Sequence, residues 1–119
     1  MSAPTTHTTP DGSTFRISCI QAVREQSLFR GQKFVFQVEG ETGEAGGIAF
    51  EVVVTFSAIA IAIASPEDRL RTDDYAEQLV ERTLDGGNRT GIHVQVTSDG
   101  AVKIDGKLFE RLYPLVAAG

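Results

Sequence analysis

Large apolar residues alternate with polar ones in several short segments, and this period of two is typical of half-buried strands. Glycine-rich or turn-forming stretches separate these segments, as expected for neighbouring strands joined by loops. The pattern predicts five strands, near residues 14–23, 33–39, 48–64, 91–97 and 101–104.

The first of these strands loses its period part of the way along. Phe15, Ile17 and Cys19 share one face, but the apolar residues within 20–23 break the alternation. Either the strand bulges there, or the chain turns helical through residues 24–28. Both interpretations stay open at this point.

The third strand has the most distinctive pattern in the chain. Large residues occupy even positions from 48 to 56, whereas from 59 to 63 they occupy odd positions, with alanines between them. A strand cannot change parity without sending its large side chains to the opposite face. Two explanations remain: a β-bulge near Ser57 and Ala58, or a continuous strand whose second half packs against something else.

A helical period appears near residues 73–85, where Thr72 or Asp73 is expected to cap the first turn. The apolar stripe of this helix consists of Ala76, Leu79, Val80 and Leu84. Two glycines at 86 and 87 end it. A second, short helix is expected over residues 108–112, because Leu108, Phe109 and Leu112 are spaced for it and Pro114 follows.

These elements predict an α+β fold: a mostly antiparallel five-stranded sheet covered by one main helix, with a short C-terminal helix. The alternative is a small barrel or a two-sheet sandwich, closed around a bent third strand. Residues 14–119 are expected to form a single domain. Residues 1–13 are rich in Thr, Ser and Pro, so we expect a disordered N-terminal tail.

Charge and length narrow the possible classes of function. The chain of 119 residues has a net charge of −5 and no run of basic residues, which argues against binding nucleic acid or an anionic membrane surface. No apolar stretch reaches the ~20 residues of a membrane helix. Residues 1–13 lack the charged start and apolar run of a signal peptide, and one cysteine makes no intrachain disulfide, so we expect a cytoplasmic protein.

Few residues point to catalysis. Cys19 and His93 could form a nucleophile and its base, but the alternation puts them on opposite faces, so we expect Cys19 to be buried and inert. Asp73, Glu77 and Glu81 share one side of the helix and could hold magnesium; a solvated acidic face is the better interpretation. We therefore expect no catalytic residue, no metal and no cofactor.

Two glycine-rich segments remain. Residues 86–91 follow a helix instead of leading into one, so they favour a helix end over a phosphate-binding loop. Residues 40–47, with Glu39, Glu41 and Glu44 in or beside them, predict an acidic connecting loop, which a basic partner could also recognise.

Two classes of function are compatible with these observations. The favoured one is a non-catalytic protein-interaction module, such as an adaptor, inhibitor or assembly subunit, that acts through an apolar sheet surface. We expect a homodimer or higher homo-oligomer, because residues 52–64 contain no charge and no proline to protect an exposed strand. The expected interface consists of Ala58, Ile59, Ala60, Ile61, Ala62 and Ile63.

The alternative is a small enzyme or ligand-binding domain with a pocket between sheet and helix. Its polar groups would come from scattered residues, namely Glu51, Arg89, His93 and Asp99.

Overall fold

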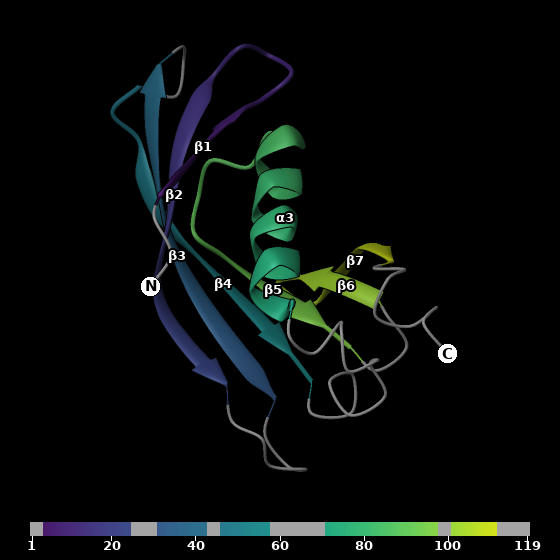
Figure 1. Cartoon of the computed structure of the whole chain (residues 1–119). Coiled ribbons are helices and arrows are strands. Elements are labelled where there is room, and N and C mark those ends of the chain that lie inside the picture. The colour runs from purple at the N-terminus through teal and green to yellow at the C-terminus, as the bar shows by residue number, and fades with distance from the viewer. Residues whose placement is uncertain (1–3, 25–30, 43–45, 58–70, 98–100, 112–119) are drawn as a thin grey trace.

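The computed structural model describes residues 4–24, 31–42, 46–57, 71–97 and 101–111. Within them, seven strands form one open sheet in the order β1-β2-β3-β4-β5-β6-β7, and α3 lies on one side of it (Figure 1). The elements are β1 (Thr5–Thr8), β2 (Thr14–Arg24), β3 (Gln32–Thr42), β4 (Ala49–Phe56), α3 (Thr72–Asp85), β5 (Ile92–Val96), β6 (Ala101–Ile104) and β7 (Lys107–Arg111).

The pairing is antiparallel except between β4 and β5, which run parallel. The connection between these two strands contains α3, which gives the chain the length that a parallel crossover needs. The prediction of a mostly antiparallel sheet with one main helix is therefore confirmed. The open strand order excludes the barrel and the two-sheet sandwich as descriptions of these strands.

The number of strands and the second helix were predicted wrongly. Residues 107–111 form strand β7, which pairs with β6 through a tight turn at Asp105 and Gly106. Both turn residues have positive φ angles, 49° and 86°, as a two-residue hairpin requires. This pairing, which exists only in the folded chain, overrides the helical spacing of Leu108 and Phe109.

The expectation of a disordered tail is also wrong for the part of it that the structure describes. Thr5–Thr8 form β1, which pairs antiparallel with the first residues of β2. Thr9 and Ser13 are buried in the turn between the two strands. Composition gave no sign of this strand, because backbone hydrogen bonds and polar side chains hold it in place.

The core lies between the sheet and α3 (Figure 1). The predicted helical stripe of Ala76, Leu79, Val80 and Leu84 is fully buried there, and α3 packs against β3 and β4. The strands contribute mainly phenylalanine and valine, including Phe15, Phe34, Val38, Val52, Val54, Phe56 and Val94. In each of these strands, the residues that the alternation predicted to face the core are the ones that are buried.

Of the two interpretations of the end of the first predicted strand, the structure shows the β-bulge. The register of β2 against β3 shifts between Cys19 and Gln21, and the strand continues to Arg24. Ile20, the extra residue, is 46% exposed. The third predicted strand is described as β4 up to Phe56, so the change of parity beyond Ser57 lies outside the described residues.

The predicted cap of α3 is corrected. Arg71 occupies the cap position without a capping side-chain hydrogen bond. Thr72 is instead fully buried, and its hydroxyl donates to Gln32 Oε1 at 2.5 Å. This buried pair ties the start of the helix to the start of β3.

Candidate functional site

The six residues of the expected interface, Ala58, Ile59, Ala60, Ile61, Ala62 and Ile63, all lie outside the described residues. Their role as an interface stays a prediction. Asp99, one of the polar groups of the alternative function, and Glu44 of the acidic loop lie outside them as well.

Cys19 and His93 lie on opposite faces of the sheet. Cys19 pairs with the core residue Phe36 and packs, half-buried, against the core. Its thiol donates to the carbonyl oxygen of Gln21. His93 pairs with Val53 on the outer face, and two strands separate it from β2. Three steps of ~4.8 Å between strands put a nucleophile and its base out of reach.

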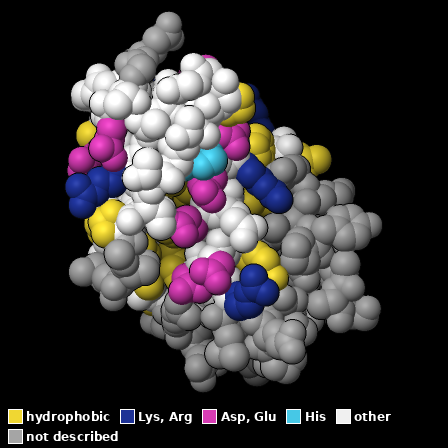
Figure 2. Space-filling view, turned by 45° about the horizontal axis from the view of Figure 1, so that its top comes forward, with side chains coloured by type: hydrophobic (Ala, Val, Ile, Leu, Met, Phe, Trp, Pro, Cys, Tyr) yellow, Lys and Arg dark blue, Asp and Glu magenta, His cyan; other side chains and the backbone are white. Residues whose placement is uncertain are grey.

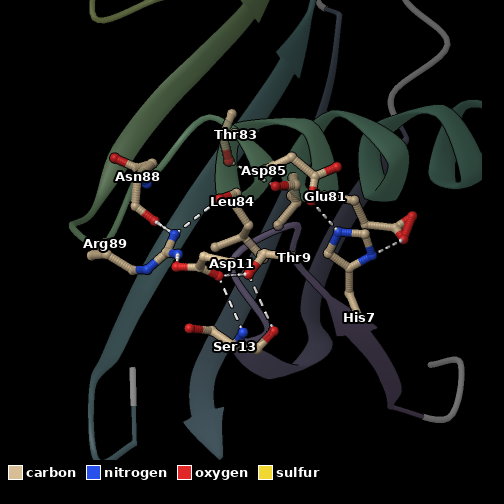
Figure 3. A network of polar contacts seen from close by, with 11 residues as sticks. His7, Thr9, Asp11, Ser13, Glu81, Thr83, Leu84, Asp85, Asn88 and Arg89 are labelled. Carbon is tan, nitrogen blue, oxygen red and sulfur yellow. Dashed lines mark hydrogen bonds and ion pairs between the residues drawn. The ribbon is translucent and has the colours of Figure 1, made fainter. Parts of the chain in front are cut away.

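The acidic side of α3 faces β1 (Figure 2). Glu77 accepts a hydrogen bond from the Thr5 hydroxyl at 2.5 Å. His7 lies between two carboxylates, with Nδ1 3.3 Å from Glu81 and Nε2 2.7 Å from Asp85 (Figure 3). Glu77 and Glu81 thus connect the first strand to the helix, which neither the metal nor the solvated-face interpretation anticipated. The described residues contain no group of three or more potential metal ligands.

Residues 86–91 end the helix, as their order in the sequence predicts. Gly87 has a φ angle of 96°, and its N–H donates to the carbonyl of Leu84. Arg89 then folds back, and its Nη1 donates to the Leu84 and Asn88 carbonyls at 2.9 and 2.8 Å. A cation beside these carbonyls also balances the negative end of the helix dipole.

Arg89 makes two further contacts that link distant segments. Its guanidinium lies 4.6 Å from the centre of the Phe15 ring. Its Nη2 lies 3.3 Å from Asp11 Oδ2 (Figure 3). Asp11 also accepts hydrogen bonds from the Thr9 hydroxyl and the Ser13 N–H. These hydrogen bonds, the Thr9 one foremost, and the Arg89 charge hold the pKa of Asp11 below its ordinary value. Arg89 therefore serves the packing of the turn against the helix end.

On the face of the sheet opposite α3, called here the outer face, the side chains form rows that run across the strands. The register aligns Gln21, Val35, Val53 and His93 in one row across four strands. A second row, next to the first, consists of Val23, Lys33, Thr55, Gln95, Lys103 and Leu108. Val35 is buried and Val53 half-buried, whereas Leu108 is 60% exposed.

Charged residues lie on either side of the valines on the outer face. Lys33 and Lys103 lie in the second row, one step beyond Val35 and Val53. On the other side, Glu51 pairs with Gln37, and Glu39 follows on β3. The outer face thus has two lysines on one side of the valines, and on the other side Glu51, Glu39 and Arg16, which pairs with Glu39.

His93 lies beside Val53 in the central row of this face, as Gln21 lies beside Val35. Its Nε2 and the Thr55 hydroxyl are 2.9 Å apart, and its backbone N–H donates to Asp105 Oδ1. These contacts join β4, β5 and the turn before β7. They orient the imidazole along the surface, against the Thr55 hydroxyl.

No helix among the described residues is both long and apolar enough to cross a membrane. Comparison with protein-family models, with curated proteins and with solved structures found no match.

Proposed function

We propose that the chain is a non-catalytic protein-interaction module that associates with a second copy of itself through the outer face of its sheet. The observation that carries this proposal is that a helix covers only one of the two faces of the sheet. The helix α3 covers one face, whereas no described element packs on the other, where the buried Val35 and the half-buried Val53 lie between charged residues. A one-sided α+β sheet with an apolar centre on its second face gains stability when another layer covers it.

The alternative, a ligand-binding or catalytic pocket between sheet and helix, has less support. Apolar side chains that are almost completely buried fill this space. Of its candidate groups, Glu51 and His93 lie on the outer face, while Arg89 is engaged with Asp11 and the helix end.

The test is the mass of the native protein in solution, measured by sedimentation equilibrium across micromolar concentrations. We expect a species of twice the chain mass of 12.8 kDa. Val53→Lys should weaken association by about tenfold or more, because a charge then enters the apolar centre of the interface. Gln78→Lys, which adds the same charge at an exposed position on α3, is the matched control and should leave association unchanged.

A wild-type protein that stays monomeric over this range would overturn the proposal, as would a Val53→Lys variant that associates like the wild type. If Val53→Lys does not fold by circular dichroism, Leu108→Lys replaces it. Leu108 is 60% exposed on the same face, so its substitution opens no cavity in the core.

A further inference from the structure

His7 on β1 has a carboxylate of α3 at each of its two ring nitrogens. Nδ1 lies 3.3 Å from Glu81 Oε2, and Nε2 lies 2.7 Å from Asp85 Oδ1 (Figure 3). An ionised carboxylate only accepts hydrogen bonds, and a neutral imidazole has a single N–H to donate. Both contacts can therefore be hydrogen bonds at the same time only when the ring carries two protons and a positive charge.

The helix supplies further charged groups around this ring. Asp85 is the last residue of α3, so the ring lies at the end of the helix where the dipole favours a cation. Arg82, also in the last turn, follows Glu81 in the chain. Glu77, one turn earlier, accepts a hydrogen bond from the first residue of β1 and does not contact the ring.

On the side of the sheet, His7 pairs with the apolar Phe15 of β2. The guanidinium of Arg89 lies over that same phenylalanine ring, and it is paired with Asp11 in the turn between β1 and β2. The described polar contacts of the His7 ring are thus the two carboxylates of α3, and its side chain is only 19% exposed to water.

We infer that the attachment of β1 to α3 depends on pH: the strand is held while His7 is charged and opens more often once the ring has lost a proton. Histidine is the side chain whose charge changes between about pH 5 and 8, a range in which carboxylates ordinarily stay ionised. A neutral ring turns a lone pair toward one of the two carboxylates, and that contact becomes repulsive. The attachment is therefore complete on the acid side of this range and weakens as the pH rises through it.

Opening of β1 uncovers the edge of β2. The four residues of β1 pair with Thr14–Ile17, and in this part of the sheet β1 is the edge strand. Without it, backbone N–H and C=O groups of β2 are left unpaired, which is what an incoming strand needs in order to add to a sheet. His7 thus controls how often this edge is accessible. The inference does not depend on the proposed function, because it concerns contacts on the helix side of the sheet.

Amide hydrogen exchange at about pH 5.5 and about pH 8 tests the inference, with each rate corrected for the intrinsic effect of pH. Protection of β1 should fall at least about threefold at the higher pH, as expected for the loss of a partly exposed ion pair. Amides of β3 and β4 are the internal reference for opening of the whole sheet, and their protection should change less than that of β1.

Glu81→Gln distinguishes this contact from a general effect of pH. The amide of the variant side chain can donate to an unprotonated Nδ1, so a neutral ring satisfies both contacts, and protection of β1 should agree within about twofold at the two pH values. Glu77→Gln is the matched control. It makes the same change one turn earlier, at the contact with Thr5, and should retain the pH dependence of the wild type.

His7→Gln removes the titrating group, so its β1 should be less protected than that of the wild type at pH 5.5 and should show no dependence on pH. Circular dichroism checks the fold of each variant, and Asp85→Asn, at the other ring nitrogen, replaces Glu81→Gln if that variant does not fold.

Three results would overturn the inference. The first is a wild type whose β1 is equally protected at both pH values or loses protection only together with β3 and β4. The second is a Glu81→Gln variant that loses protection at pH 8 as the wild type does. The third is a His7→Gln variant that keeps the pH dependence, which would assign it to another group.

Discussion

Gly31 lies just before β3, where the chain passes the end of β4. The two backbones approach so closely at this point that no side chain fits between them. A Cβ atom at this position would lie 1.6 Å from the carbonyl oxygen of Phe56. The obstacle is backbone, so no side-chain rotation relieves it. The adjacent pair, Gln32 with Phe56, begins the register of β3 against β4. Gly31 is therefore a condition for this register.

We predict that Gly31→Ala destabilises the protein by at least about 2 kcal/mol, because β3 and β4 must move apart to accept the methyl group. Chemical denaturation monitored by circular dichroism measures the loss. Gly86→Ala is the control: its Cβ would meet the Arg82 and Thr83 carbonyl oxygens at an ordinary 3.5 Å, so the change should stay within about 0.5 kcal/mol. Equal effects of the two substitutions would contradict this assignment.

Asp11 provides a pH-dependent contribution at the turn between β1 and β2. Its pKa is lowered in the folded protein, chiefly because the Thr9 hydroxyl donates to the carboxylate. A group whose folded pKa is depressed stabilises the fold above its unfolded value and loses this contribution as the pH falls through the folded value. The stabilisation is thus present above the ordinary value of 3.8 and declines below it.

We predict that Asp11→Asn lowers the melting temperature at neutral pH and that the difference from wild type shrinks as the pH is taken below 3.8. Thermal melts recorded at a series of pH values check this expectation. A constant difference across the series would show that Asp11 acts through hydrogen-bond geometry and not through its charge.

The strand β1 shows how an element without apolar side chains is held. Thr5 and His7 point toward α3 and contact Glu77, Glu81 and Asp85. The alternate residues, Thr6 and Thr8, face away from the helix and are exposed. β1 is therefore an edge strand attached by backbone hydrogen bonds on one side and polar contacts on its inner face.

We predict that His7→Ala reduces the free energy of unfolding by about 0.5 to 1 kcal/mol, the range of partly exposed ion pairs. It should also increase amide hydrogen exchange in β1 more than in β3 or β4. Thr6→Ala, which alters the outward side of the same strand, should change neither quantity. Unchanged exchange in the His7 variant would mean that the backbone ladder alone holds β1.

Taken as a whole, the molecule has two unlike faces. One face of the sheet is covered by α3 over an apolar core, and the other combines central valines with charged residues on either side. The described strands give a sheet with two free edges, at β1 and β7. In the proposed self-association, a second copy on the outer face would complete a sandwich of α3, sheet, sheet and α3.

Sequence and tertiary structure determined different parts of this protein. The alternation at Phe15 and Ile17 and the valines of β4 predicted strands, and the apolar stripe around Leu79 predicted the helix. In each case the pattern also identified the face that is buried in the core, because the spacing of buried residues follows the period of the element. The sequence did not predict β1 and β7, because these strands form by pairing with β2 and β6. Backbone hydrogen bonds place little constraint on the type of side chain, so the residues show no clear strand pattern. The placement of the charged residues on the outer face needed the register, since only pairing across strands brings Lys33 level with Lys103.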